Sequence, residues 1–372
     1  MARLGDICTV NMGQSPDSAT YNEVGRGLPF FQGNADFGRL HPAVRVWCSE
    51  PTKIAHTGDI LISVRAPIGA MNVADQDCCI GRGLAAIQVN ENICDPKYLW
   101  YAIQSKVSDL NAKGTGSTFK AISKSTLTDT EVLLVPLDAQ KNIARILSNV
   151  ENSILFRKEQ LTKLDELIKA RFVEMFGDPI SNTKRWDVIE LGSLTGIGSS
   201  KRIFEKEYVS EGIPFYRTKE IVELSKGNPI STELYITEKR FLEIKEQYGV
   251  PQKGDLLISA VGTIGVIWIV DEKNDFYFKD GNLIRVDSSD RFNSTYMKTL
   301  LESLIAEYKK QMSSGTAYSA LTISGLMKMK IYDVPLSLQN QFAAFVAEVD
   351  KSKLLAELFA QNACILAENR SK

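Results

Sequence analysis

An internal duplication is the feature that most constrains what this chain of 372 residues can fold into. The string GDILISVRAPIG at residues 58–69 returns as GDLLISAVGTIG at residues 254–265, and seven of the twelve positions are identical. LPFF returns as IPFY, GTGSTFKAIS as SSGTAYSALTIS, and VPLDAQKNIARIL as VPLSLQNQFAAFV, in the same order along the chain. Repeats that keep this order predict two copies of one domain.

Each copy has the same organisation, a mostly β region followed by a long helix. Short apolar runs separated by glycine, proline, asparagine and aspartate predict the strands. The runs lie at residues 60–64, 79–89, 256–261 and 264–270. A Pro-Leu pair precedes the helix in each copy. We therefore expect globular domains over residues 1–137 and 178–335, and helices over residues 138–177 and 336–372.

The first helix carries the stripe of a coiled coil. Asp138 is the expected N-cap, and Gly177 belongs to the stop signal. Apolar residues recur between them in an alternating 4-3 spacing, which is typical of a coiled-coil seam. The seam positions are Ile143, Leu147, Val150, Ile154, Arg157, Leu161, Leu164, Ile168, Arg171 and Met175.

The second helix is expected to begin near residue 338, and its apolar stripe is less regular. Lys353 and Ala356 occupy positions where the seam would place larger apolar side chains. Two helices that each end one copy are natural antiparallel partners. The predicted fold is therefore α+β, with two mostly-β domains joined by two long helices that form an antiparallel coiled coil.

The sequence disfavours several classes of enzyme. It contains no GxxxxGK[ST] loop and no complete GxGxxG fingerprint, so a phosphate-binding role for residues 58–69 is disfavoured. The two histidines lie in the first copy, and none of the six cysteines forms a CxxC pair, so no zinc site is expected. No segment reaches the ~20 apolar residues of a membrane span. We expect a cytoplasmic protein with reduced, buried cysteines.

The charge balance leaves the class of partner open. Residues 1–137 carry 12 basic and 13 acidic side chains, residues 178–335 carry 21 and 22, and the whole chain has a net charge of −1. A protein that binds nucleic acid by itself usually has a basic excess, so this balance argues mildly against DNA. A basic partner could nevertheless supply the phosphate contacts.

The two copies keep their apolar letters and change the polar residues beyond them. Gln32-Gly33-Asn34 follows LPFF, whereas Arg217-Thr218-Lys219 follows IPFY. In the duplicated string, Arg65-Ala66-Pro67 faces Val261-Gly262-Thr263. This pattern suits two copies of a reading head, because such side chains recognise base edges and phosphates. Neutral drift on exposed loops is the alternative explanation.

The whole chain resembles the specificity (S) subunits of Type I restriction-modification systems. The resemblance rests on LGDICTVNMGQSP, GLPFFQGNADFG, GDILISVRAPIGAMNVA, the GTGSTFKAIS…VPL…Q run into the long helix, and the repetition of that order. It implies two target-recognition domains that each read one half of a bipartite site in double-stranded DNA. The helices would set the spacing and dock methyltransferase (M) subunits.

The resemblance also implies a non-catalytic subunit without cofactors of its own. S-adenosylmethionine, ATP and Mg are expected on the partner M and restriction (R) subunits, and no membrane partner is expected. The near-neutral charge fits a complex in which the M subunits hold the duplex. Two other functions stay open on residue chemistry alone, a scaffold that binds proteins through its duplicated domains and a self-sufficient enzyme.

Polar residues in the loops of both copies are the candidates for DNA contact. In the first copy they are Gln32, Asn34, Arg65, Lys113, Ser117, Thr118 and Lys120. In the second copy they are Arg217, Lys219, Thr263, Lys279, Ser314, Thr316 and Tyr318. No catalytic or metal-binding residue is expected.

Overall fold

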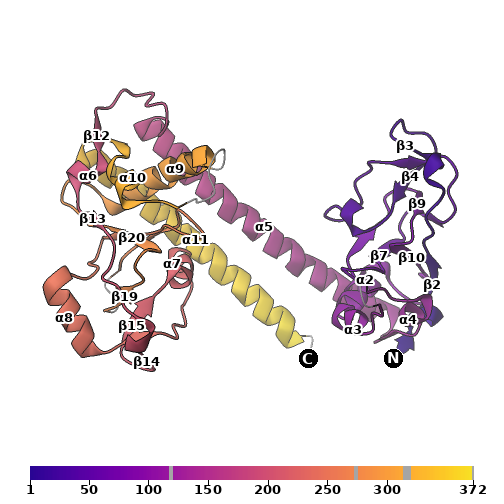
Figure 1. Cartoon of the computed structure of the whole chain (residues 1–372). Helices are drawn as coiled ribbons and strands as arrows, with labels where there is room; N and C mark the ends of the chain where they lie inside the picture. The colour runs from indigo at the N-terminus through magenta and orange to yellow at the C-terminus, as the bar shows by residue number, and fades with distance from the viewer. Residues whose placement is uncertain (117–119, 272–274, 313–319, 371–372) are drawn as a thin grey trace. The chain divides into compact units, whose positions relative to one another are not determined.

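The computed structural model describes residues 1–116, 120–271, 275–312 and 320–370. The chain divides into two compact units (Figure 1). Unit 1 comprises Met1–Leu155 and Asn362–Lys372, and unit 2 comprises Phe156–Gln361. Among the described residues, no helix combines the length and the apolar character that crossing a membrane requires.

Unit 1 contains two main sheets. The four-stranded sheet has the order β2-β10-β7-β8, and the five-stranded sheet has the order β3-β5-β4-β9-β6. The strands of the first are β2 (Cys8–Met12), β7 (Ile60–Ser63), β8 (Met71–Val73) and β10 (Leu84–Val89). Those of the second are β3 (Tyr21–Asn22), β4 (Leu28–Phe31), β5 (Trp47–Cys48), β6 (Ile54–Ala55) and β9 (Cys78–Ile80). The remaining elements before the long helix are β1 (Ala2–Arg3), β11 (Glu131–Val132), α1 (Leu4–Ile7), α2 (Pro96–Gln104), α3 (Val107–Ala112) and α4 (Lys124–Thr128).

Unit 2 repeats this topology, except that β6 has no counterpart among the strands that the structure describes there. Its sheets have the orders β13-β20-β17-β18 and β14-β16-β15-β19. The first contains β13 (Ile197–Gly198), β17 (Leu256–Ser259), β18 (Ile267–Ile269) and β20 (Leu283–Val286), and the second contains β14 (Tyr208–Val209), β15 (Ile213–Tyr216), β16 (Tyr235–Ile236) and β19 (Tyr277–Phe278). The other elements are β12 (Val188–Glu190), β21 (Lys330–Tyr332), α6 (Leu191–Leu194), α7 (Thr218–Ser225), α8 (Glu238–Tyr248), α9 (Ser294–Met312) and α10 (Ile323–Met327). The matching strand orders confirm the predicted duplication.

The four-stranded sheet of unit 1 is buried on both faces. Ile60 and Ile62 of β7 pack into the cluster that includes Leu99 of α2. Leu61, which points to the opposite face, packs against Phe31 of the five-stranded sheet. Successive strand residues face opposite sides, so burial of both faces explains why this strand is a continuous apolar run rather than an alternating one.

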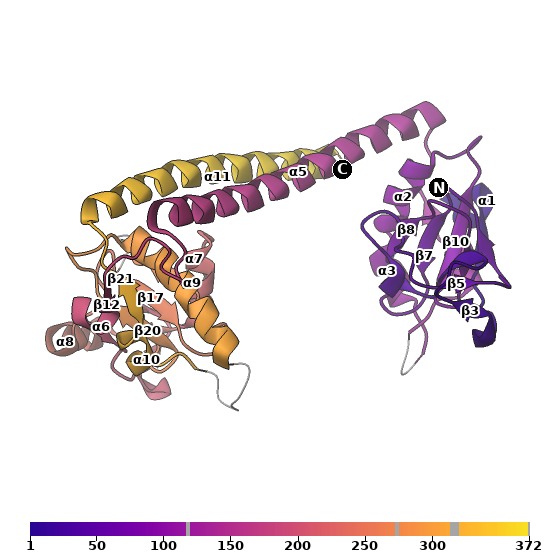
Figure 2. The same cartoon turned by 90° about the horizontal axis from the view of Figure 1, so that it is seen from above.

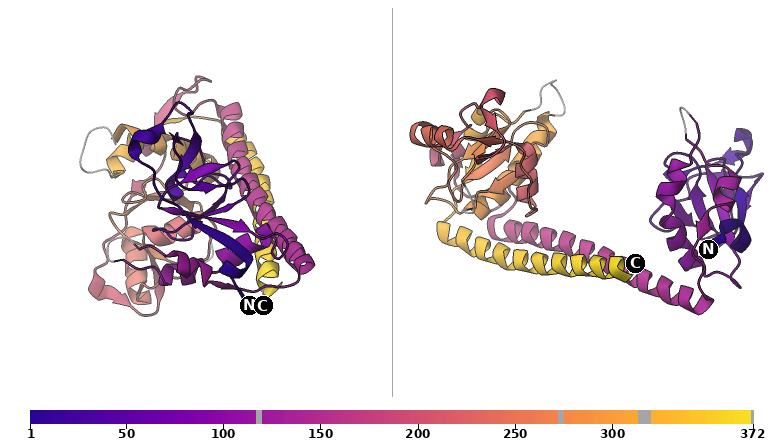
Figure 3. Two further views of the ribbon diagram at one scale, coloured as in Figure 1. Left: turned by 90° about the vertical axis from the view of Figure 1, so that its right-hand side faces the viewer. Right: turned by 90° about the horizontal axis from the view of Figure 1, so that it is seen from below.

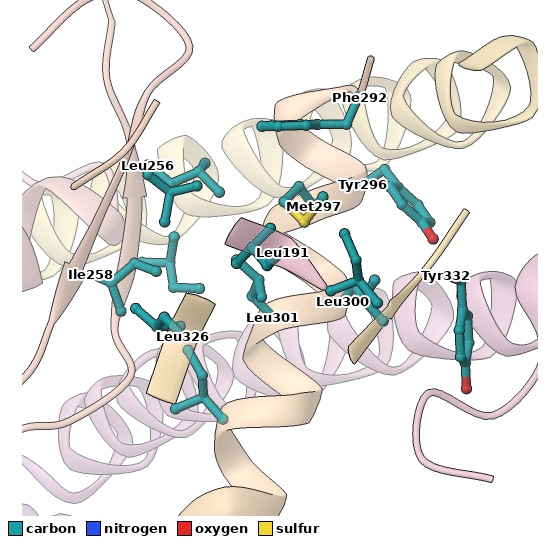
Figure 4. Packing of buried hydrophobic residues seen from close by; sticks show 14 of the residues in the cluster. Leu191, Leu256, Ile258, Phe292, Tyr296, Met297, Leu300, Leu301, Leu326 and Tyr332 are labelled. Carbon is teal, nitrogen blue, oxygen red and sulfur yellow. The ribbon is translucent and has the colours of Figure 1, made fainter. Parts of the chain in front are cut away.

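Unit 2 has the same layers. Leu256 and Ile258 of β17 face the cluster that contains Leu300 of α9 (Figure 4), while Leu257 packs with Phe215 of β15. Each unit is therefore a sheet covered by helices on one side and by a second sheet on the other.

Both units build the repeated Gly-Asp pair as the same turn around a buried aspartate. The Asp59 carboxylate accepts a hydrogen bond of 2.9 Å from the His56 N–H, and the Asp255 carboxylate accepts one of 2.9 Å from the Gln252 N–H. Gly58 has φ 91° and its counterpart Gly254 has φ 88°, a conformation that glycine adopts readily. Most of the repeated string is thus scaffold, a turn followed by a fully buried strand.

The long helix α5 (Leu137–Phe176) begins one residue earlier than the sequence predicts. Asp138 lies in its first turn and is not the N-cap, although a carboxylate there is still favourable to the positive end of the helix. Pro136 fixes this start, since the Gln140 N–H donates to its carbonyl oxygen over 3.0 Å.

A buried glutamine ties the start of each long helix to its own unit. The Gln140 Nε2 donates to the carbonyl oxygens of Val135 (2.7 Å) and Ile93 (3.1 Å), and its Oε1 accepts from the Asp95 N–H over 2.9 Å. In α11 (Leu336–Arg370), Gln339 takes the same position.

The second glutamine repeats two of the three contacts of the first. Its Nε2 donates to the Val334 carbonyl oxygen over 2.8 Å, and its Oε1 accepts from the Asn293 N–H over 2.9 Å. Gln339 is 3% exposed, and Gln140 is fully buried. The glutamine of the repeated VPL…Q string therefore joins the helix to the loop that precedes α2 in unit 1 and α9 in unit 2.

Within unit 2, the end of α5 and the start of α11 lie side by side and antiparallel (Figures 2 and 3). Asp165 of α5 forms an ion pair of 2.7 Å with Lys353 of α11. Further along α5, the Arg171 guanidinium lies 5.7 Å from the ring centre of Phe345, which precedes Lys353 on α11. Later residues of one helix thus meet earlier residues of the other, as predicted for an antiparallel pair.

The core at this end of the helices extends beyond the predicted seam. Phe172 and Phe176, one position beyond the predicted Arg171 and Met175, are 2% and 0% exposed. Their rings lie 5.4 and 5.6 Å from that of Phe342, because α5 packs here against α9 as well as α11. The lysine at an expected seam position, Lys353, is accommodated by its ion pairs with Asp165 and Asp350.

The buried glutamines give a prediction about stability. The variant Gln140→Ala leaves the Asp95 N–H and two carbonyl oxygens without their partner. This change should lower the free energy of unfolding by about 1–3 kcal/mol. Hydrogen exchange of peptides around Asp95 should therefore accelerate, while peptides around Asn293 keep their protection. Gln339→Ala should produce the reverse. The exposed neighbour Lys141, changed to alanine, is the control and should alter neither region; equal effects of Gln140→Ala on both units would contradict the assignment.

Candidate nucleic-acid interface

A parallel strand pair positions the loops of interest in each unit. β4 and β9 pair in parallel through Phe30–Cys79 and Phe31–Ile80. β15 and β19 do the same through Phe215–Tyr277 and Tyr216–Phe278. The carboxyl ends of parallel strands lie at the same edge, where open sheets commonly bind their ligands. The loop after β4 therefore lies next to the loop that joins β9 to β10. The loop after β15 likewise lies next to the loop that joins β19 to β20.

Three predicted residues of unit 1 meet in one surface depression. This unit 1 depression, of about 230 Å³, is lined by Gln32, Gly33, Asn34, Ser63, Arg65, Ala66, Arg82 and Gly83. Gln32 and Arg65 are exposed, and Asn34 is partly exposed. Sequence reasoning selected these three from loops more than 30 residues apart, and the strand pairing brings them together.

Arg82 is a lining residue that sequence reasoning missed. It stands between Gly81 and Gly83, and a Cβ at Gly83 would lie 2.3 Å from the Gln32 carbonyl oxygen. Two glycines therefore let this loop approach the Gln32 backbone, and they present the one long side chain between them. The available signal was a basic residue in the loop where the second copy has Lys279, although the strand register matches Lys279 with Gly81 and Arg82 with Asp280.

A buried carboxylate holds the Gln32 loop in shape. The Asp36 carboxylate accepts hydrogen bonds from the N–H groups of Gln32 (2.8 Å) and Gly33 (3.4 Å). The Arg45 guanidinium pairs with the same carboxylate, whose side chain is only 15% exposed. The amide of Gln32 is thus carried on a fixed backbone, which suits a recognition role.

Lys120 lies beside the arginine of the duplicated string. Its carbonyl oxygen accepts a hydrogen bond of 3.1 Å from the Ala66 N–H, and its neighbour Ala121 forms a bridge with Arg65. Lys113 is exposed and caps the C-terminus of α3, two residues before the Thr115–Ala121 bridge. The other two predicted residues of this loop, Ser117 and Thr118, lie outside the described residues.

In unit 2 the loop after β19, which corresponds to the loop of Arg82, lines a larger hollow of about 590 Å³ together with residues 202–205. Lys279, one of the predicted residues, lies in this unit 2 hollow together with Arg202, Phe204 and Asp280. Arg202, which sequence reasoning missed, donates from Nε to the Asp280 carboxylate over 2.7 Å. Arg202, which lies between β13 and β14, is therefore matched by an acidic residue of the loop after β19.

Arg217, at the N-cap of α7, forms an ion pair with Glu220 of the same helix. Its guanidinium donates to the Glu220 carboxylate over 2.9 Å, and its backbone N–H donates to the same group over 2.8 Å. Burial alone would raise the pKa of Glu220, which is 1% exposed, but the hydrogen bonds from Arg217 hold this pKa below its ordinary value. The sequence selected Arg217 as a DNA contact, and the structure places its charge on a buried carboxylate.

The remaining predicted residues of unit 2 are dispersed. Lys219 is exposed in the first turn of α7, and Thr263 is exposed in the turn after β17, where its carbonyl oxygen accepts from the Ser259 hydroxyl. Neither lines the unit 2 hollow. The other predicted residues of this unit, Ser314, Thr316 and Tyr318, lie outside the described residues.

These sites offer hydrogen-bond donors rather than reactive groups. In the described part of the chain, no cluster of histidine, cysteine, aspartate or glutamate could hold a metal ion. Cys8, Cys48, Cys78, Cys79 and Cys94 are buried free thiols, as predicted for these five. Burial raises the pKa of Cys8 and Cys78 to about 12, so these thiols are poor nucleophiles at neutral pH.

Comparison with known proteins gives one consistent family. The family model described as the Type I restriction modification DNA specificity domain matches residues 1–166 and 183–360. The putative type I restriction enzyme MjaX specificity subunit of Methanocaldococcus jannaschii is 39% identical over 158 residues, which cover 42% of this chain and 37% of that protein.

Two further comparisons span more of the chain. The putative type I restriction enzyme specificity subunit S.HindORF215P of Haemophilus influenzae is 29% identical over 256 residues, 68% of this chain and 63% of that protein. The chain thus spans less than two thirds of these relatives' length. The crystal structure of the Type-I restriction-modification system S subunit from M. genitalium has a TM-score of 0.62 over 99% of this chain and 93% of that one, at 16% identity, so it shows the same fold.

The family model matches each of the two duplicated domains separately and covers well over half of the chain. The chain therefore belongs to the Type I restriction-modification DNA specificity family.

Proposed function

We propose that this chain is the DNA sequence-recognition subunit of a Type I restriction-modification complex, and that each unit reads one half of a bipartite target. The observation that carries the proposal is the repeated loop pair at the carboxyl ends of β4 and β9 and of β15 and β19. Both pairs carry basic residues, and at least one loop of each pair lines a surface hollow, but their polar side chains differ. Equal scaffolds with different donors and acceptors suit two half-sites of different sequence.

The long helices set the spacing between the half-sites and dock the M subunits. α5 supports this role because it is one helix of 40 residues with anchors in two cores. Ala144 packs into a core of unit 1, and Phe172 and Phe176 pack into a core of unit 2. An unbroken helix is the stiffest connection that a single chain can make over such a length, and it has no Pro or Gly between its anchors.

The chemistry belongs to the partners. S-adenosylmethionine is carried by the M subunits, and ATP and Mg are used by the R subunits, while this chain contributes recognition and no catalytic group. Its cytoplasmic location follows from that role, since the substrate is double-stranded DNA.

The first prediction of this proposal concerns the modified sequence. When the chain is expressed with its M subunit, genome-wide mapping of methylated adenines should give a single interrupted motif. Exchange of residues 1–137 for the first domain of another specificity subunit should change one half of that motif. A change in both halves, or in neither, would refute the assignment of one half-site to each unit.

The second prediction distinguishes DNA recognition from a protein-binding scaffold. Binding of the assembled complex to a duplex should weaken steeply with salt, because phosphate contacts release counterions. The triple variant Arg65→Ala, Lys113→Ala, Lys120→Ala should lower the slope of log K against log salt by roughly one for each phosphate that the complex no longer neutralises. The triple variant Lys53→Ala, Lys97→Ala, Lys124→Ala serves as the matched control, because it removes three exposed charges of unit 1 that do not line the depression. A flat salt response of the wild-type complex would favour the scaffold.

A further inference from the structure

The arginines at the two loop pairs differ in their electrostatic surroundings. In unit 2, Arg202 is paired with Asp280 and Arg217 with Glu220. In unit 1, neither Arg65 nor Arg82 forms an ion pair with any residue that the structure describes, although both line the same depression. The guanidinium groups of Arg65 and Arg82 are thus available to an outside acceptor, whereas those of Arg202 and Arg217 are occupied.

Hydrogen bonds fix the backbone at Arg82 and at the residues on both sides of it. Its own N–H donates to the Ser15 hydroxyl over 3.3 Å. The preceding Gly81 N–H donates to the Phe31 carbonyl oxygen over 2.8 Å, and the Gly83 carbonyl oxygen accepts from the Val64 N–H over 2.9 Å. A side chain on a backbone fixed at three successive residues loses less conformational entropy on binding than one on a free loop.

The neighbours of Arg82 suit the edge of a base. The amide side chains of Gln32 and Asn34 line the same depression, and the carboxylate of this loop, Asp36, is occupied by Arg45. A guanidinium presents a fork of donors, and in the major groove guanine is the base that presents two acceptors, O6 and N7, to such a fork. A phosphate would also attract the charge of Arg82, but its binding would require neither the fixed backbone of Arg82 nor the amide side chains of Gln32 and Asn34.

We propose that Arg82 is a specificity-determining residue of unit 1 that reads a guanine in the half-site of that unit. This inference rests on the proposed function and adds to it a base and a contacting side chain. Unit 2 reads its half-site without a counterpart of this contact, since Asp280 occupies the nearest arginine.

The test uses the complex of the whole chain with its M subunit, and the half-site of unit 1 is identified by the exchange of residues 1–137. Arg82→Ala should relax one G·C position of that half-site and lower discrimination there by about 5- to 150-fold, the range expected when one bidentate pair is removed. Arg82→Lys keeps the charge and should keep most of the affinity, but it should also lose discrimination at that position.

A base analogue gives an independent readout. Replacement of the guanine by 7-deazaguanine removes N7 and should weaken binding of the wild-type complex, whereas the Arg82→Ala complex should not respond. The control variant is Arg26→Ala, because Arg26 is also an exposed arginine between two glycines of unit 1 but does not line the depression. It should leave the motif and the response to 7-deazaguanine unchanged.

The outcomes separate the inference from the proposed function. If the wild-type complex modifies no interrupted motif, the proposed function is wrong. If it does, but Arg82→Ala weakens binding equally on all sequences and Arg82→Lys restores it, Arg82 is a phosphate contact and the inference alone is overturned. Unchanged discrimination in Arg82→Ala, or a half-site of unit 1 without a G·C pair, overturns it as well.

Discussion

Burial of both faces of a four-stranded sheet holds each unit together. The three residues Ile60, Leu61 and Ile62 are each at most 2% exposed, and full burial of such a side chain contributes about 1.5–3 kcal/mol. A polar side chain on either face would lose this contribution and would need a buried partner. The sheet therefore limits which residues β7 and β17 can carry, and it leaves variation to the loops at their ends.

This constraint explains how much of the fold the sequence could predict. The apolar strings recur because the same layers recur, so the duplication, the strand regions and the antiparallel helices were all predictable. The errors occur where a third element joins the packing. The seam prediction placed Arg171 and Met175 toward the partner helix, where Arg171 does meet Phe345 and Met175 packs against the core, but it missed that α9 also draws Phe172 and Phe176 into this core. A heptad pattern describes two helices and does not include a third.

The candidate site was predictable to a smaller extent, for a different physical reason. Sequence comparison of the copies found Gln32, Asn34 and Arg65, which the strand pairing brings into one depression. It could not find that Arg202 meets Asp280, because 78 residues separate them and only the fold makes them neighbours. The pairing of Arg217 with Glu220 was within reach of sequence reasoning, since a carboxylate three residues into a helix commonly caps its start.

The exposure of each ion pair decides which arginine can exchange its partner for a base. The Asp280 carboxylate that pairs with Arg202 is only 12% exposed, so releasing Arg202 would leave a largely buried charge without its partner. Glu220 is 1% exposed, so removing Arg217 would leave a buried charge, which costs about 3–5 kcal/mol. That cost exceeds the ~1–3 kcal/mol that a bidentate base contact supplies. Arg217 therefore stays with its carboxylate, and the net charge of the chain, which counts every arginine equally, says little about which of them can meet DNA.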